Sequence, residues 1–123
     1  MKKSIILFLG MLLFSVAKEK PISQYTLAFT DCMEHRSNPN ACIEEELKHQ
    51  DKKLNTAYRE AKKSIQPFRL KSLRDIQKAW IKYRDKKCSF FHHKESGLGG
   101  VTDALQCELD MTIKRARELK KIF

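Results

Sequence analysis

Apolar residues recur at helical spacing along most of the chain, and no stretch alternates apolar and polar residues as a half-buried strand would. The predicted helices cover residues 24–35, 41–65, 68–90 and 102–121. The breaks between them fall at an Asn-Pro-Asn turn (residues 38–40), at Pro67 and at a glycine-rich stretch (residues 95–100). Lys, Glu, Leu, Ala and Arg dominate the helical segments, and these residues favour helix.

Each predicted helix has one mainly apolar face, so the helices are expected to pack as a small bundle. The short connection at residues 65–68 predicts that the second and third helices are antiparallel neighbours. Thr102 is placed to cap the last helix. Gly99 and Gly100 are expected in the flexible loop before it. The fold class predicted is therefore all-α, a small bundle of about four helices.

The first 17 residues have a different pattern, because Lys2 and Lys3 precede an uncharged apolar run that ends in Ser15-Val16-Ala17. A basic start, an apolar centre and a small-x-small end are typical of a secretory signal peptide. The run is short for a membrane span, which needs about 20 apolar residues, although an uncleaved anchor is the alternative. We therefore expect a signal peptide at 1–17, a single domain at 18–123, and a periplasmic or secreted protein without a membrane span after cleavage.

The four cysteines, Cys32, Cys42, Cys88 and Cys107, all follow the predicted signal peptide. An even number of cysteines in a small exported domain is typical of disulfides. Three pairings are possible, and the spacing favours Cys32–Cys42 and Cys88–Cys107 because each pair closes a short local loop. Zinc is the rival interpretation, but no C-x-x-C occurs and no histidine has ligand spacing to a cysteine pair. We expect no metal and no cofactor.

The chain of 123 residues has 25 Lys and Arg against 15 Asp and Glu, a formal net charge of +10, of which two charges belong to the predicted leader. A basic helical surface suits anionic partners such as envelope polymers or lipopolysaccharide. Export argues against nucleic acid as the partner. Glu44-Glu45-Glu46 is interpreted as a solvated face near a helix start, and His92-His93 as exposed loop residues.

Several polar residues fall on helix faces that are expected to be buried. The candidate set is Asp51, Asn55, Tyr58, Gln77, Trp80 and Arg84. In an antiparallel hairpin centred near residue 66, Asn55 lies opposite Gln77 and Asp51 reaches Arg84. A buried charge must be paired, so one interpretation is an internal network that fixes helix register. The alternative is a polar groove that binds a ligand. The set contains no nucleophile with an adjacent base, so an enzyme is not expected.

The same residues carry a family resemblance. The motifs are Leu54-Asn55-x-x-Tyr58, then Gln77-x-x-Trp80-Ile81-x-Tyr83-Arg84-Asp85-x-x-Cys88, then Gly99-Gly100, Cys107 and Thr112-x-x-Arg115. Together with the other cysteines they resemble the LprI-like lysozyme-inhibitor family over about residues 32–119. The resemblance implies an exported helical domain with paired cysteines that binds and inhibits lysozyme and so protects peptidoglycan.

The net charge bears on that implied function. Many lysozymes are strongly basic, and long-range electrostatics between two basic proteins oppose a complex. A local acidic patch is needed to engage a basic cleft, and Glu44-Glu45-Glu46 with Asp51 is the candidate. The alternative function is a cationic periplasmic module that binds anionic envelope polymers or lipopolysaccharide. A contiguous acidic patch favours the first function, and a continuous basic face favours the second.

Overall fold

All regular secondary structure in the described part of the protein is helical. The structure is a computed structural model that describes residues 23–122, and the predicted signal peptide lies outside these residues. The elements are α1 (Leu27–His35), α2 (Pro39–Ser64), a 3-10 turn (Pro67–Arg69), α3 (Leu70–Ser89) and α4 (Gly97–Lys121). The all-α prediction is confirmed, with four helices close to their expected bounds. Within residues 23–122, none of the helices combines the length and apolar character required to cross a bilayer.

Local sequence explains where the first two helices begin. The Thr26 hydroxyl accepts a hydrogen bond from the backbone N–H of Phe29, which caps α1. The Asn38 side chain accepts one from the backbone N–H of Asn40 at 3.1 Å, and Pro39 occupies the first position of α2. Proline suits that position because its missing N–H has no partner there and its φ is already helical.

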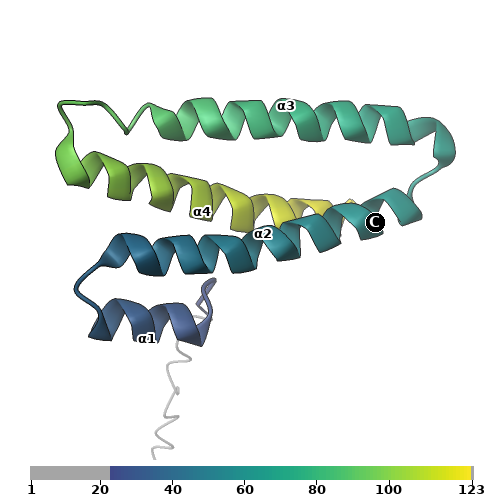
Figure 1. Ribbon diagram of the computed structural model, residues 1–123. Coiled ribbons are helices and arrows are strands. Elements are labelled where there is room, and N and C mark those ends of the chain that lie inside the picture. The colour runs from purple at the N-terminus through teal and green to yellow at the C-terminus, as the bar shows by residue number, and fades with distance from the viewer. Residues whose placement is uncertain (1–22, 123) are drawn as a thin grey trace, which may run out of the picture.

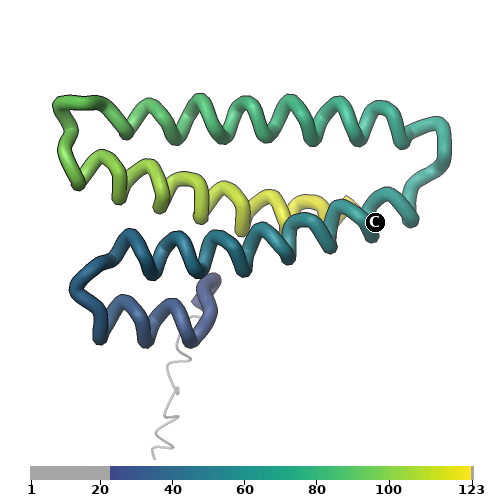
Figure 2. Tube along the Cα trace, viewed as in Figure 1, coloured from purple at the N-terminus to yellow at the C-terminus, as the bar shows by residue number. Residues whose placement is uncertain are grey.

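The last helix, α4, lies between α2 and α3 (Figures 1 and 2). The second and third helices do run antiparallel, as expected, but the expectation that they are direct neighbours is wrong. Near the 3-10 turn the two helices are close, but they diverge from it and both pack mainly against α4. The physical reason is that α4 is buried on two sides. Leu109 and Ile113 contact α1 and α2, whereas Leu119 packs with Leu73 of α3.

The glycine-rich stretch is also different from the expectation, because α4 begins at Gly97 instead of near Thr102. Gly99 and Gly100 thus lie in the first turn of α4 and not in a loop. Gly97 has a φ of +61°, a conformation that glycine adopts readily. A Cβ at buried Gly100 would approach the Phe91 carbonyl oxygen to 2.6 Å, so this position requires glycine. Thr102 does not cap α4, because it lies inside the helix. Its hydroxyl donates to the Asn40 side chain.

Two apolar clusters hold the helices together. The first joins α1, α2 and α4 and consists of Phe29, Cys32, Cys42, Ile43, Leu109 and Ile113. The second joins α2, α3 and α4 and consists of Leu54, Ala57, Ala61, Leu73, Ala116 and Leu119. The first cluster lies at the start of α2 and the second toward its end. Burial of these side chains is the main favourable contribution to folding.

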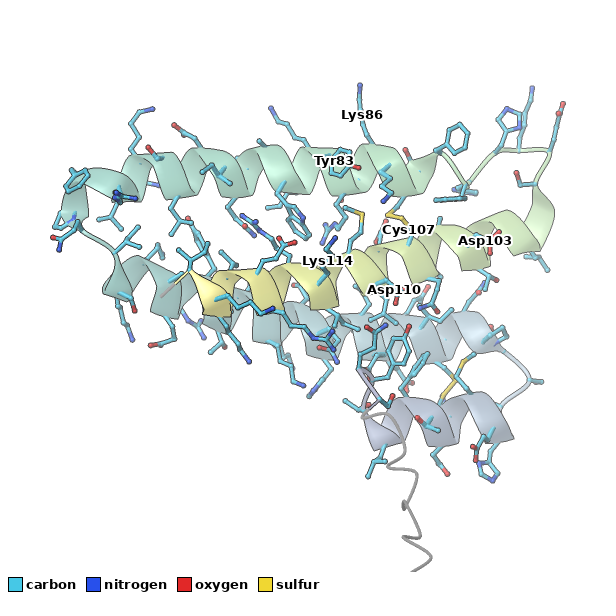
Figure 3. All side chains as sticks on the ribbon, turned by 180° about the vertical axis from the view of Figure 1, so that it is seen from behind. Tyr83, Lys86, Asp103, Cys107, Asp110 and Lys114 are labelled. Carbon is cyan, nitrogen blue, oxygen red and sulfur yellow. A yellow bond between two sulfur atoms is a disulfide. The ribbon has the colours of Figure 1, made fainter. Side chains whose placement is uncertain are left out.

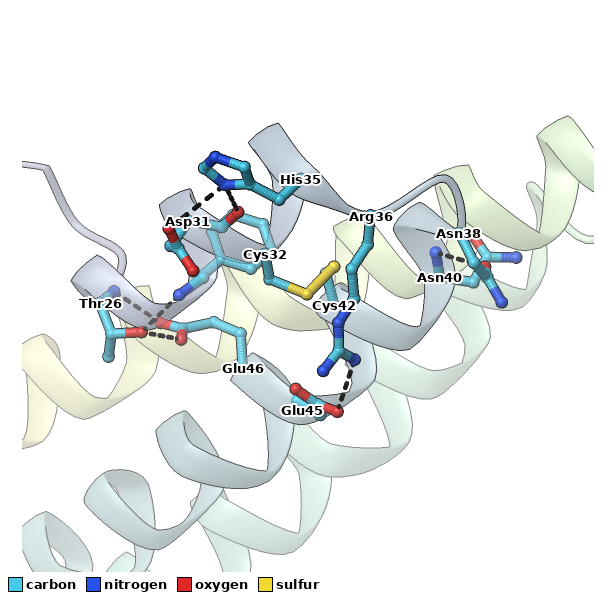
Figure 4. Close-up of a disulfide and its surroundings, with 11 residues drawn as sticks. Thr26, Asp31, Cys32, His35, Arg36, Asn38, Asn40, Cys42, Glu45 and Glu46 are labelled. Atoms are coloured by element: carbon cyan, nitrogen blue, oxygen red, sulfur yellow. Dashed lines mark hydrogen bonds and ion pairs between the residues drawn. A yellow bond between two sulfur atoms is a disulfide. The ribbon is translucent and has the colours of Figure 1, made fainter.

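The disulfides pair as the spacing predicted. Cys32–Cys42 links α1 to the first turn of α2, and Cys88–Cys107 links the end of α3 to the first half of α4. Figure 4 shows the first bridge beside the turn that joins the two helices. In a domain of this size, such bridges restrict the unfolded chain and add stability that a modest core does not supply.

Candidate binding groove

Acidic and basic side chains are separated along this fold. Residues 23–51 and 97–110 contain nine Asp and Glu against two Lys and Arg. These segments are α1, the first half of α2 and the first half of α4, which pack together around the first apolar cluster, and we call them the acidic end. Residues 52–94 and 111–122, the basic body, contain nineteen Lys and Arg against four Asp and Glu. The net positive charge is therefore not spread evenly.

A groove of about 310 Å³ lies where the acidic end meets α3. It is lined by Glu44, Leu47, Lys48, Asp51, Arg84 and Glu108. The four residues from α2 are spaced by three or four positions, so they share one helix face, and Glu108 approaches them from α4. Leu47 also packs against the first apolar cluster, so it supplies an apolar surface between charged groups.

Arg84 is held in place at the edge of the groove. Its Nη1 donates to the Thr112 hydroxyl at 3.3 Å, and its Nε and Nη2 donate to Asp85 Oδ1 at 3.0 and 2.9 Å. Its guanidinium also lies 5.2 Å from the centre of the Trp80 ring, within the range of a cation–π contact. These contacts fix a half-buried cation from α3 opposite the carboxylates of α2 and α4.

The groove carboxylates of Glu44, Asp51 and Glu108 take part in none of the salt bridges found among residues 23–122. Asp51 accepts only a 3.4 Å hydrogen bond from Asn55. Carboxylates that form no internal salt bridge are available to Lys and Arg side chains of a partner, and bidentate pairing with arginine is the strongest contact of this kind. The groove is thus suited to a partner surface with a protruding positive charge.

The predicted polar set is only partly brought together. Asp51 and Arg84 line the same groove but are not paired, since Arg84 pairs with Asp85. Asn55 is exposed and contacts Asp51, so its expected contact with Gln77 is not formed. The separation of α2 from α3 by α4 explains both departures. Tyr58 is half-buried against the second apolar cluster and lies under the Lys62 ammonium, away from the groove.

Gln77 and Trp80 are organised by a residue of α4 instead. Gln77 Oε1 accepts a hydrogen bond of 2.9 Å from Nε of buried Arg115, whose Nη1 donates to Glu118. Arg115 and Arg84 lie 5.8 and 5.2 Å from the Trp80 ring centre. These contacts fix the register of α3 against α4, which is the role that sequence reasoning assigned to an α2–α3 network.

Glu46 is a second correction, because it is only 3% exposed and is no part of a solvated face. Its carboxylate accepts hydrogen bonds from the backbone N–H and the hydroxyl of Thr26 (Figure 4). It also accepts one from the Gln50 amide. Burial raises the pKa of Glu46, but the hydrogen bonds from Thr26 and Gln50 together outweigh burial, so its pKa is lowered from 4.5. Glu46 thus ties the start of α1 to α2. Glu44 and Glu45 are exposed, as expected.

The pKa of Glu46 gives a pH-dependent prediction. Because the folded-state pKa is depressed, the stabilisation is fully present above the unfolded value of 4.5 and is lost as the pH falls through the folded value. Replacement of Glu46 by Gln should lower the free energy of unfolding by about 1–3 kcal/mol at neutral pH. The deficit should shrink at acid pH. Urea denaturation at several pH values measures it, with exposed Glu60→Gln as control. A deficit independent of pH contradicts the role of the carboxylate.

A further polar contact joins α1 to α4 at the acidic end. The Tyr25 hydroxyl donates to Asp110 at 2.6 Å, and the Gln106 amide donates to both groups at 3.0 Å. Burial and the hydrogen bond to Asp110 raise the pKa of Tyr25, so the hydroxyl stays a donor at neutral pH. Asp110 is therefore used within the fold, unlike the groove carboxylates.

Sequence reasoning did not single out Glu108 or Arg115 as candidates, and it placed Glu46 in a solvated acidic patch. A signal for Glu46 exists in the spacing, since Ile43, Glu46, Gln50 and Leu54 follow one helix face and are all buried. Two polar residues of this otherwise apolar face, Glu46 and Gln50, are thus buried and bonded to each other. No local signal identifies Glu108, because its place in the groove depends on how α4 packs. Among residues 23–122, no three His, Cys, Asp or Glu side chains gather as metal ligands would.

The fold and the groove define a small all-helical domain with two disulfides and an open, charged concavity. A family model described as lysozyme inhibitor LprI matches residues 30–119. This match spans most of the sequence, so the chain belongs to the LprI family of lysozyme inhibitors. The family assignment made from the motifs is thereby confirmed. No curated protein and no solved structure is significantly similar to the chain.

Proposed function

We propose that this LprI-family protein binds a basic lysozyme through the groove at its acidic end and thereby protects peptidoglycan outside the cytoplasm. The observation that carries the proposal is the set of three groove carboxylates, Glu44, Asp51 and Glu108, that form no salt bridge among the described residues. These carboxylates give the groove local electrostatic complementarity to a basic partner, although the net charge of the chain is positive.

Screening makes the local charge more important than the net charge. At physiological ionic strength the Debye length is about 8 Å. The 26 residues of α2 span about 39 Å, with the acidic end at one terminus and basic residues toward the other. A lysozyme seated at the groove is therefore largely shielded from the far part of the basic body. The contact between carboxylates and lysozyme cations then decides the affinity.

The two disulfides support an extracytoplasmic location, since disulfides persist in the periplasm or outside the cell. Lysozyme acts on peptidoglycan in the same compartments. A periplasmic or secreted inhibitor would meet the enzyme before it reaches the cell wall. One disulfide joins α1 to α2 within the acidic end, and the other joins α4 to α3. The oxidised protein is therefore the form to assay.

The test of the proposed function is the lysis of bacterial cell walls by lysozyme, followed as loss of turbidity. The oxidised, exported chain should slow lysis by a basic lysozyme in a saturable manner. Several lysozyme types should be compared, including one with an acidic surface that the groove is not expected to hold. Unchanged lysis at large molar excess over every basic lysozyme would overturn the proposal.

Charge removal in the groove gives the sharper prediction. The double substitution Glu44→Gln/Glu108→Gln should weaken inhibition about tenfold, because each exposed charge pair contributes about 0.2–1 kcal/mol. The matched control is Glu60→Gln/Asp75→Asn, which also removes two carboxylate charges, but from exposed positions of α2 and α3 within the basic body. The control should inhibit like the unmodified protein. Equal loss in both variants would indicate that overall charge, and not the groove, governs inhibition.

A further inference from the structure

One flank of α3 carries apolar side chains that no other part of the described protein covers. Ile76, Tyr83 and Phe90 are 55%, 59% and 83% exposed. They are spaced by seven residues, so they form a stripe along one side of the helix. The stripe is distinct from the buried face, which carries Leu73, Gln77 and Cys88. We call Ile76, Tyr83 and Phe90 the α3 stripe.

An apolar hollow extends the α3 stripe at the start of the helix. It has a volume of about 350 Å³ and includes Phe68, Ile76 and Ile122 among its lining residues. Phe68 is 77% exposed, and the Arg69 guanidinium lies 5.6 Å from its ring centre. Exposed aromatic and aliphatic groups of this number on one edge of a small protein indicate an interaction surface.

Strong positive charge surrounds the α3 stripe. Residues 67–89 contain eight Lys and Arg against two Asp. Lys87 lies 5.9 Å from the Tyr83 ring, and Lys86 points away from α4 in Figure 3. On an ideal helix Lys82 and Lys86 flank the stripe on one side and Lys87 flanks it on the other. Long lysine side chains at the margins of an apolar stripe are placed to reach headgroups while the apolar groups enter the layer below.

We propose that α3 docks on the surface of an anionic lipid bilayer, with the α3 stripe and Phe68 entering the interface and the flanking lysines contacting headgroups. An amphipathic helix with a basic polar face and Phe, Tyr or Ile on the other has the composition of interfacial helices. A second copy of the chain is a poorer occupant, because two basic α3 faces repel each other. A soluble anionic polymer can pair with the lysines, but it offers no apolar layer in which the exposed apolar side chains would be buried.

The test is co-sedimentation of the exported, oxidised chain with vesicles of phosphatidylcholine mixed with phosphatidylglycerol, and with vesicles of phosphatidylcholine alone. Binding to the anionic vesicles should exceed binding to the neutral ones. The variant Lys82→Gln/Lys86→Gln should bind the anionic vesicles about 25-fold more weakly, since each lysine near the surface contributes about fivefold. The control Lys52→Gln/Lys53→Gln removes two exposed charges from α2 and should lose much less.

The apolar contribution is tested with Ile76→Ser/Tyr83→Ser/Phe90→Ser. Its binding to anionic vesicles should fall at least about tenfold, because interfacial affinity scales with buried apolar area. The control Leu27→Ser/Leu98→Ser removes comparably exposed apolar groups outside α3. Circular dichroism establishes that each variant keeps its helices. Full vesicle binding by the stripe variant would overturn the proposal, because the lysines alone would then explain binding and the surface would be assigned to anionic polymers. A stripe variant that keeps vesicle binding but loses a dimer formed by the unmodified protein would assign the surface to self-association.

Discussion

Replacement of Cys88 and Cys107 by alanine is expected to lower the free energy of unfolding by about 3 kcal/mol. The bridge closes a loop of 19 residues, and its loss restores the conformational freedom of that loop in the unfolded chain. It also joins α3 to α4 at the end away from the second apolar cluster, where α3 has little apolar contact of its own. Urea denaturation followed by circular dichroism measures the change.

The matched control is Cys32→Ala/Cys42→Ala, which opens a loop of 10 residues. Its expected cost is similar, about 2.7 kcal/mol by the same chain-entropy relation. The two variants differ in what they release, because only loss of the α3–α4 bridge should increase amide exchange at residues 80–89. A destabilisation below about 1 kcal/mol, with unchanged exchange in α3, would contradict this role of the bridge.

Leu109→Ala is expected to cost about 2–5 kcal/mol, the range for buried leucines. Leu109 is 0% exposed and packs in the cluster that joins α1, α2 and α4. Its removal leaves a cavity between three helices that are held on different sides by disulfides and hydrogen bonds, so the site has little freedom to collapse. Thermal or urea unfolding gives the value directly.

Leu98→Ala is the control for Leu109→Ala, since it makes the same substitution in α4 at an exposed position. Surface substitutions of this kind usually change stability by less than about 0.5 kcal/mol. Similar effects at both positions would mean that Leu109 is not in the core that joins the helices.

Local information in the sequence was sufficient for the helices and the disulfides. Periodicity located all four helices, and loop length selected the two cysteine pairs among three possibilities. The exception was the start of α4, which was predicted too late in the chain because glycine has a low intrinsic helix propensity. At that point Gly100 permits a close approach to the Phe91 carbonyl that no pattern in the sequence reveals.

The way in which the helices pack could not be predicted from local sequence. The short connection suggested that α2 and α3 contact each other, but α4 packs between them because apolar residues lie on two of its sides. The consequence for the site is direct. Gln77 faces Arg115 of α4 instead of Asn55, and the groove gains Glu108 from a segment 57 positions beyond Asp51. The description of the family names lysozyme, but it identifies no contact residue in this chain.

The separation of charge reconciles a basic chain with a basic target. The acidic end concentrates nine carboxylates on three packed segments, and three of them line the groove without forming a salt bridge among the described residues. The expected candidate patch at Glu44-Glu45-Glu46 changes accordingly. Glu46 is used to hold α1, whereas Glu44 remains available and is joined in the groove by Asp51 and Glu108.

The location of the lysozyme contact is the most direct test of the proposed function. Backbone amide signals of the isotopically labelled, oxidised chain should be recorded by nuclear magnetic resonance as a basic lysozyme is added. Shifts are expected at Glu44, Lys48, Asp51 and Glu108, with the α3 stripe around Ile76 and Tyr83 unchanged. Absence of any shift, or shifts confined to α3 and the second half of α2, would contradict binding through the acidic groove.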